Sequence, residues 1–141
     1  YEGSALEDFF GKFAYNNDLV ALKWLGVHAR SWRENTLSQV VELTNHQAFR
    51  IANPNCVYAL IGGFAFDNPL HFHAPDLSGY HFLYQFLEQI DDINPQVASY
   101  LGKSLHVPYL PDTQKEQIRN IFAPLAKKGC SQNLREVLSV L

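Results

Sequence analysis

Apolar side chains recur every three or four positions along almost the whole chain, and no segment alternates regularly between apolar and polar residues. This spacing places side chains on one face of an α-helix, so it predicts helices rather than strands. The apolar stripes comprise Phe9, Phe10 and Phe13; Leu19, Leu22, Trp24 and Leu25; Leu37, Val40, Val41 and Leu43; Val57, Leu60, Ile61 and Phe64; Tyr80, Leu83, Leu87 and Ile90; Val97, Ala98, Leu101 and Leu105; Ile118, Ile121, Phe122 and Leu125; and Leu134, Val137, Leu138 and Leu141.

Polar residues mark the expected starts of several helices. Ser4 with Glu7, and Thr36 with Gln39, have the spacing of a capping box, in which two side chains bind backbone N–H groups in the first turn. Asn17 stands before a further apolar stripe and is expected to cap it.

Two Asn-Pro pairs, Asn53-Pro54 and Asn94-Pro95, also predict helix starts. An asparagine oxygen can accept a hydrogen bond from an N–H group of the first turn, and a proline just inside the helix loses no hydrogen bond. The segment 66–77 between these helices contains two further prolines, so we expect a long irregular loop there.

The expected fold is all-α, with about seven or eight helices of roughly 10–14 residues. Short connections favour antiparallel hairpins. Stacked hairpins of the armadillo or HEAT type and a closed helical bundle both fit the periodicity, because no clean sequence repeat separates them.

Composition is that of a single globular domain of 141 residues, of which 47% are hydrophobic and only 18% are charged. The net charge is −3 and the 11 Lys and Arg residues are dispersed, so we expect no nucleic-acid partner. The longest apolar run, residues 57–66, is too short to cross a membrane and predicts a buried helix.

Two isolated cysteines, Cys56 and Cys130, form no disulfide framework, which favours a reducing compartment such as the cytoplasm. Cys56 follows a predicted helix start, but a buried and unreactive thiol is the expected role. The sequence contains no Met, so Tyr1 is not the product of a start codon. We therefore expect a segment of a longer protein.

Catalytic sequence patterns are absent: there is no H-E-x-x-H, G-x-S-x-G or G-x-G-x-x-G. His71, His73 and Asp76 lie within six residues and could hold a metal ion, although no fourth ligand is evident. The favoured alternative is that His73 binds loop backbone while His71 faces solvent. No metal site and no catalytic residue are therefore expected in this chain.

Other conspicuous residues are expected to be structural. The aromatic run at residues 80–86 has no accompanying Arg or Lys, so it predicts core packing rather than nucleobase stacking. Trp24 lies in an apolar stripe, whereas Trp32 stands between arginines and is expected at a surface or interface. Asp91-Asp92 is expected to be a solvated acidic pair at a helix end.

Ordered blocks across most of the chain resemble the C-terminal domain of bacterial aminopeptidase N. The resemblance covers nearly the whole chain and thins after about residue 104. It rests on Ala5-Leu6-Glu7, Leu19-Val20, Lys23-Trp24, Asn53-Pro54-Asn55, Leu60-Ile61-Gly62, Phe64-Ala65, Asn68-Pro69, Phe72-His73-Ala74, Asp76, Ser78-Gly79-Tyr80, Phe82-Leu83 and Asn94-Pro95-Gln96-Val97-Ala98-Ser99.

The resemblance implies a function that the spacing does not show. Enzymes of this family are zinc-dependent exopeptidases that remove N-terminal residues from peptides, and their zinc motif lies in an upstream domain. Their C-terminal domain is a helical, armadillo-like right-handed superhelix that closes over the catalytic domain and lines distal substrate subsites. Residues 1–141 would then be part of that noncatalytic domain, with the upstream catalytic domain and peptide substrates as partners.

The resemblance also singles out individual positions. Gln96 matches a glutamine beside the substrate pocket of such enzymes, where an amide can both donate to and accept from a peptide backbone. Arginines of the enterobacterial enzyme correspond here to Cys56, Tyr58 and Tyr100, so recognition of a peptide carboxylate by charge is in doubt. The expected substrate-binding residues are Gln96, Tyr100 and Tyr58. Glycine stands in the family where this chain has Leu77, so the loop there is expected to turn differently.

Two other functional classes stay open at this point. The chain could be a stand-alone helical-repeat module that binds a protein or peptide on a concave face. It could also be a small metal-binding protein that uses His71 and His73.

Overall fold

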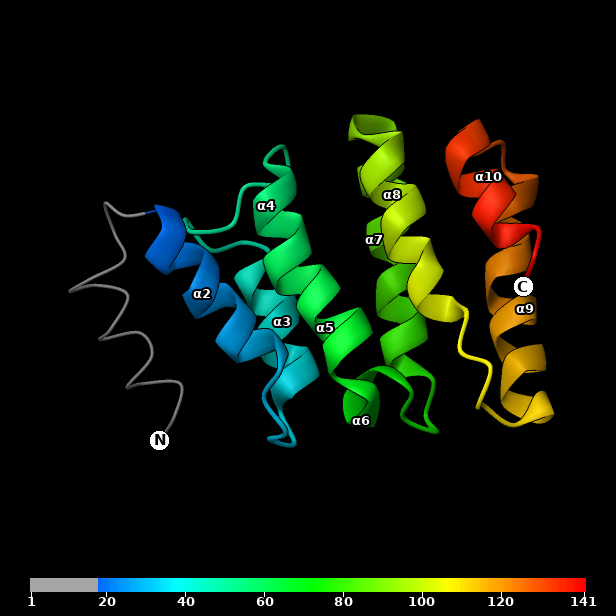
Figure 1. The fold of residues 1–141 in the computed structure, drawn as a ribbon, viewed down its shortest axis with the longest axis horizontal. Coiled ribbons are helices and arrows are strands. Elements are labelled where there is room, and N and C mark those ends of the chain that lie inside the picture. Colours follow the sequence, from blue (N-terminus) through cyan, green and yellow to red (C-terminus); the bar gives the residue numbers. More distant parts are fainter. Residues whose placement is uncertain (1–17) are drawn as a thin grey trace. The chain divides into compact units, whose positions relative to one another are not determined.

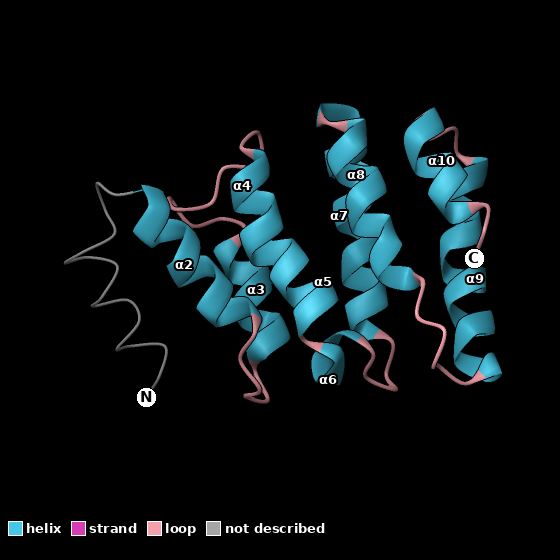
Figure 2. Ribbon diagram, in the orientation of Figure 1, coloured by secondary structure: helices cyan, strands magenta, loops and turns pink. Residues whose placement is uncertain are grey.

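The computed structural model describes residues 18–141, and these residues are helical with no strand (Figures 1 and 2). The expected all-α class is therefore confirmed for this part of the chain. The predicted cap at Ser4 and Glu7, the stripe from Phe9 and the cap at Asn17 lie outside it. The helices are α2 (Asp18–Ala29), α3 (Thr36–Leu43), α4 (Pro54–Val57), the π-helix η2 (Tyr58–Gly62), α5 (Gly63–Asp67), α6 (Pro69–Phe72), α7 (Ser78–Ile93), α8 (Pro95–Gly102), the 3₁₀-helix η3 (Lys103–Leu105), α9 (Asp112–Lys127) and α10 (Gln132–Leu138).

The chain forms two compact units, Tyr1–His71 and Phe72–Leu141. In the first unit, α4, η2 and α5 follow one another without a break, and this continuous helix packs along α2 (Figure 1). Gly63 permits a close approach, because a Cβ atom there would lie 3.1 Å from the Cβ atom of Ala29. Helix α3 packs on α2 as the other half of a hairpin. The core of this unit includes Trp24, Leu25, Val40, Val57, Leu60, Ile61 and Phe64.

The second unit consists of two hairpins, α7 with α8 and α9 with α10. The corresponding helices of the two hairpins pack together. The first helices, α7 and α9, lie against each other, and so do the second helices, α8 and α10. Each fully buried Leu or Phe side chain contributes about 1.5–3 kcal/mol to such a core. The buried residues here include Tyr80, Leu83, Leu87, Ile90, Val97, Leu101, Ile118, Phe122, Leu125 and Leu134.

The two predicted Asn-Pro helix starts are confirmed. Asn53 Oδ1 accepts a hydrogen bond from the N–H of Asn55 at 3.0 Å, and α4 begins at Pro54. Asn94 Oδ1 accepts from the N–H of Val97 at 3.3 Å, and α8 begins one residue after Asn94. Asn94 directly follows α7, so a single residue makes the turn of this hairpin.

The predicted capping box at Thr36 and Gln39 is wrong. Thr36 is the first residue of α3, and its hydroxyl donates backwards to the carbonyls of Ser31 at 2.9 Å and Arg33 at 2.7 Å. Gln39 Oε1 instead lies 3.1 Å from Nδ1 of His28 on α2. The polar groups that resembled a local cap therefore hold the preceding turn and join two helices.

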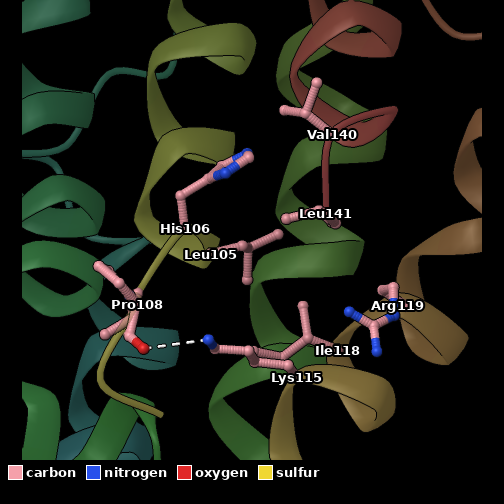
Figure 3. A pocket seen from close by; sticks show the side chains of 9 residues that line it. Leu105, His106, Pro108, Lys115, Ile118, Arg119, Val140 and Leu141 are labelled. Atoms are coloured by element: carbon pink, nitrogen blue, oxygen red, sulfur yellow. Dashed lines mark hydrogen bonds between the residues drawn. The ribbon is translucent and has the colours of Figure 1, made fainter. Parts of the chain in front are cut away.

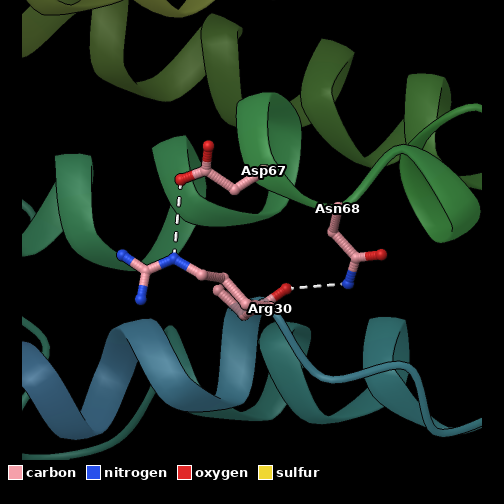
Figure 4. A network of polar contacts seen from close by, with 4 residues as sticks. Arg30, Asp67 and Asn68 are labelled. Carbon is pink, nitrogen blue, oxygen red and sulfur yellow. Dashed lines mark hydrogen bonds and ion pairs between the residues drawn. The ribbon is translucent and has the colours of Figure 1, made fainter.

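The expected loop at residues 66–77 is partly helical, because it contains the end of α5 and all of α6. Asn68, between these two helices, forms the hydrogen bonds that hold the segment in place. Asn68 is fully buried, and its Nδ2 donates to the carbonyls of Ala29 at 2.9 Å and Ser31 at 2.8 Å. Beside it Arg30 Nε lies 3.5 Å from Asp67 Oδ2, an exposed ion pair (Figure 4). These contacts fix the end of α5 against the end of α2.

No helix in residues 18–141 combines the length and the hydropathy needed to cross a membrane.

Candidate functional site

Helix α8 presents an exposed face that carries two of the three predicted substrate-binding residues. Gln96 is exposed, Tyr100 is 43% exposed, and the four-residue spacing places them on the same side of the helix. Val97 and Leu101 face the other way and are buried where α8 packs on α7 and α10. Within its unit, α8 therefore has one face in the core and one face in contact with solvent.

Lys103 extends this face and was missed by the sequence analysis. It is exposed, begins η3 directly after α8, and stands seven residues beyond Gln96. Positions i, i+4 and i+7 share one side of a helix, so this spacing was the available signal. Gln96, Tyr100 and Lys103 together define what we call the α8 face: an amide, a phenol and an ammonium group within about two helical turns.

Tyr58, the third predicted residue, belongs to the first unit. It is 40% exposed and begins the π-helix η2. π-helical segments are rare and occur often at functional sites, because the wider turn displaces side chains from their regular positions. The structure therefore places all three predicted residues at the surface, with Gln96 and Tyr100 on one helix and Tyr58 in the other unit.

Cys56, which corresponds to one of the family's arginines, does not reach the surface. It is 2% exposed, and its Sγ lies 3.6 Å from the carbonyl oxygen of Ala48. The expectation of a buried cysteine is confirmed. A buried thiol with a backbone partner cannot replace an arginine that contacts a ligand in solvent.

The histidine-rich loop forms no metal centre among the described residues, which contain no group of three His, Cys, Asp or Glu side chains that could hold a metal ion. His73 Nδ1 lies 2.5 Å from the Tyr80 hydroxyl, and Gln114 Nε2 donates to that hydroxyl at 2.8 Å and to the His73 carbonyl at 3.1 Å. The prediction that His73 binds loop backbone is therefore wrong, since its ring pairs with a side chain. Burial lowers the pKa of His73 and raises the pKa of Tyr80.

His71 and Asp76 have separate environments. The side chain of His71 was expected to face solvent. This prediction is wrong for its Nε2 atom, which is buried and has no hydrogen-bond partner in the structure. Asp76 is exposed, and its Oδ1 accepts from the N–H of Ser78 at 3.0 Å and from the Ser78 hydroxyl at 2.7 Å. The Ser78 backbone N–H lowers the pKa of this carboxyl group.

Leu77, between Asp76 and α7, adopts a left-handed backbone conformation with φ 65° and ψ 8°. Glycine adopts this region without cost, whereas a residue with a Cβ atom is strained there. The backbone at Leu77 therefore has a conformation that suits glycine, although the sequence has leucine.

Asp91 was expected to be solvated, and this prediction is wrong. Its side chain is buried, and Oδ2 accepts a hydrogen bond from the N–H of Ser131 at 2.8 Å. The Ser131 hydroxyl donates to the other carboxylate oxygen and also accepts from the N–H of Leu134 at the start of α10. Asp92, the neighbouring acid, is exposed as expected.

The aromatic predictions are confirmed for Tyr80, Phe86 and both tryptophans, whereas Phe82 and Tyr84 are half-buried. Tyr80 and Phe86 are buried in α7, and Trp24 is 1% exposed. Trp32 is 75% exposed in the turn between α2 and α3. The position of each tryptophan in or outside an apolar stripe therefore correctly distinguished the buried Trp24 from the exposed Trp32.

In this chain, consecutive helical hairpins stack so that the first helix of one packs on the first helix of the next, and the second on the second. This arrangement is typical of an armadillo-type repeat domain. The sequence model of the family described as "Domain of unknown function (DUF3458_C) ARM repeats" matches residues 2–141. The chain belongs to this family, the C-terminal ARM-repeat domain of bacterial aminopeptidase N.

Individual relatives agree with this assignment. The chain is 34% identical to aminopeptidase N of Caulobacter vibrioides over 96% of its own length and 16% of the relative. It is 46% identical to aminopeptidase N of Escherichia coli over 64% of its length and 10% of the relative. A crystal structure of Legionella pneumophila aminopeptidase A in complex with aspartic acid superposes with a TM-score of 0.88 at 25% identity, over 97% of this chain and 16% of that one. The chain thus spans about a sixth or less of these proteins.

Proposed function

We propose that this chain is a noncatalytic domain of an aminopeptidase that removes N-terminal residues from peptides, and that it encloses the active-site cavity and lines distal substrate subsites. The observation that carries the proposal is the 34% identity to Caulobacter vibrioides aminopeptidase N over 96% of this chain. Similarity along almost the entire chain is expected of a domain that is retained as a whole. Both compact units would then belong to one domain that spans residues 1–141.

The chemistry would be supplied by another part of the longer protein. The chain has no H-E-x-x-H, and residues 18–141 contain no group of side chains that could hold a zinc ion. Zinc bound elsewhere in the protein would activate a water molecule to attack the peptide carbonyl. The role of this domain is then to restrict access to that centre.

The α8 face and Tyr58 are the residues that we assign to peptide contact. An exposed amide at Gln96 can donate to a peptide carbonyl and accept from a peptide N–H, which suits recognition independent of sequence. Tyr100 and Tyr58 are exposed, and each phenol ring combines a flat apolar surface with a hydroxyl that can form a hydrogen bond. No arginine remains at these positions, so binding would depend on hydrogen bonds and stacking.

The partner of this domain would be the catalytic domain of the same polypeptide, and the compartment would be the cytoplasm. Free Cys56 and Cys130 support a reducing environment. Trp32, 75% exposed on the first unit, is the kind of surface aromatic residue that a neighbouring domain covers.

A domain exchange tests the proposal. In Caulobacter vibrioides aminopeptidase N, the segment that aligns with this chain is replaced by this chain, deleted, or replaced by an unrelated helical-repeat segment of equal length. We expect the first protein to release N-terminal residues from peptides and the other two to lose this activity. Full peptidase activity in the deleted protein would disprove the role.

The source gene provides a second test that does not depend on folding of the exchanged protein. Codons upstream of Tyr1 are expected to encode an in-frame H-E-x-x-H followed by a glutamate ligand. A stop codon and a local start codon at that point would instead favour a stand-alone binding module.

A further inference from the structure

A pocket of about 420 Å³ opens on the second unit, and its lining includes none of the three residues of the α8 face. Its walls are the segment that follows η3, one side of α9 and the chain end that follows α10 (Figure 3). This volume lies in the range of small-molecule sites. No role was assigned to its residues by the sequence analysis or by the proposed function.

The floor of the pocket is aliphatic, and its mouth is cationic. Leu105 and Ile118 are buried at the floor, and Val140 lines the opposite wall. Lys115 and Arg119 lie four residues apart on α9, so both side chains extend from the same side of the helix toward the pocket (Figure 3). The residues that line it include no Asp or Glu side chain, although in the 141-residue chain Leu141 carries a main-chain carboxylate.

Hydrogen bonds hold two of the polar groups at the pocket. Lys115 Nζ donates to the carbonyl of Pro108 at 3.0 Å, which fixes the ammonium group at the mouth and leaves it two further donors. Nε2 of His106 lies 3.1 Å from the carbonyl of Val137. A carbonyl only accepts, so Nε2 carries the proton and the imidazole ring is held in place.

Arg119 can contribute a second positive charge. Its Nη2 lies 3.4 Å from Glu116 Oε2, and the two side chains are 46% and 67% exposed. An exposed ion pair of this kind contributes little free energy, so a ligand carboxylate can compete with Glu116 for the guanidinium group. A planar guanidinium group can also bind a carboxylate through two parallel hydrogen bonds.

We propose that this pocket binds a carboxylate carried on a short branched aliphatic group. The aliphatic part would occupy the floor formed by Leu105 and Ile118, and the carboxylate would lie between Lys115 and Arg119. Two sources have this chemistry: a free branched-chain acid and the C-terminal residue of a peptide. The proposal concerns α9 and its neighbours alone, so it stands whether or not the peptidase role is correct.

Methyl NMR spectra of the chain, labelled at isoleucine, provide the test. Ile118 reports on the pocket and Ile61, buried in the first unit, serves as the internal reference. The probes are 4-methylvalerate for the free acid, N-acetyl-leucine for the peptide terminus, and 4-methylpentan-1-ol as the uncharged analogue. We expect saturable shifts of Ile118 and not of Ile61, with a carboxylate bound at least about tenfold more tightly than the alcohol.

Two double variants test whether the charges of Lys115 and Arg119 are responsible for carboxylate binding. The double variant Lys115→Met with Arg119→Met is expected to weaken carboxylate binding at least about tenfold. The matched control, Lys23→Met with Arg50→Met, removes an equal charge from the first unit and likewise breaks an exposed ion pair, that of Arg50 with Asp18. The control is expected to bind as the unmodified chain does.

Salt dependence tests the proposal even if the double variant does not fold. Raising the salt from about 0.05 M to 0.5 M should weaken binding of the carboxylate and leave the alcohol unchanged. Tighter binding of N-acetyl-leucine would assign the site to peptide termini, and tighter binding of 4-methylvalerate would assign it to free acids. Equal affinity for acid and alcohol, or no shift of Ile118 with either acid, would overturn the proposal.

Discussion

At the scale of single residues, Leu77 is the position where sequence and backbone disagree most clearly. Its left-handed conformation is one that glycine adopts freely and that costs an L-residue with a side chain about 1–2 kcal/mol. The strain is retained because the residue stands in a tight connection, where its N–H donates to the Ala74 carbonyl at 3.0 Å and α7 begins immediately afterwards.

Paired substitutions at Leu77 separate backbone strain from loss of the side chain. Leu77→Gly and Leu77→Ala both remove the side chain, but only glycine relieves the strain, so the glycine variant should be more stable by about 1 kcal/mol. At Leu19, exposed within α2, the order should reverse by a similar amount. Urea denaturation measures the four free energies of unfolding. If the alanine variant were more stable than the glycine variant at both positions, Leu77 would not be strained.

His73 determines a dependence of stability on pH. Burial lowers the pKa of His73 in the folded chain below its ordinary value of 6.5. As the pH falls, the unfolded chain therefore binds a proton at this histidine at a higher pH than the folded chain does. Protonation would also make Nδ1 a donor toward the Tyr80 hydroxyl, which already accepts from Gln114. The free energy of unfolding should therefore be fully retained above pH 6.5 and decrease as the pH falls below it.

The variant His73→Asn isolates this contribution. Urea denaturation at several pH values between about 7.5 and 5 should give a shallower loss of stability for the variant than for the unmodified chain. Identical slopes would mean that the protonation of His73 does not differ between the folded and unfolded states.

At the scale of helices, Asp91 joins the end of α7 to the start of α10. Both of its carboxylate oxygens accept hydrogen bonds from Ser131, one from the N–H and one from the hydroxyl. Ser131 in turn caps α10 through the N–H of Leu134. One carboxylate therefore holds the residue that starts another helix, so its loss should destabilise the contact between two hairpins.

We expect Asp91→Ala to lower the free energy of unfolding by about 1–3 kcal/mol, because two donors lose their partner in a partly buried site. The adjacent Asp92→Ala, at an exposed carboxylate, should change it by no more than about 0.5 kcal/mol. Thermal and urea unfolding of the two variants give the comparison. Similar losses for both would contradict the assigned role of Asp91.

At the scale of the whole molecule, the question is whether the α8 face contacts peptide in the assembled enzyme. Gln96→Ala and Tyr100→Ala, made in the exchanged aminopeptidase described above, should raise KM for peptides about 2–10-fold with little change in kcat. On the proposed function, each variant would remove contacts that substrate and transition state share equally. Gln117→Ala and Tyr109→Ala, at exposed positions outside this face, are the matched controls. Equal KM values in variants and controls would exclude the α8 face from substrate binding.

Much of the fold could be predicted because the relevant forces act between residues close in sequence. Hydrophobic periodicity identified the all-α class, and the Asn-Pro pairs identified two helix starts, since a cap and its N–H group are at most three residues apart. The same local reasoning failed at Thr36, where capping-box spacing occurs but the hydroxyl donates to two carbonyls of the preceding turn. Gln96 was singled out by the family resemblance and not by local spacing, and neither indicated that Lys103 extends the same face.

Only the tertiary structure decided which polar groups are buried and what they bind. Asn68 is 39 residues from Ala29, Asp91 is 40 residues from Ser131, and Gln114 is 34 residues from Tyr80. Such pairs form only after particular helices have packed, because a buried polar group must then find a partner among whatever groups lie near. Spacing along the chain was therefore sufficient for the all-α class and for most of the described helices, but not for α6, which was expected to be loop. The connections between helices and the cationic pocket on α9 depend on the folded arrangement.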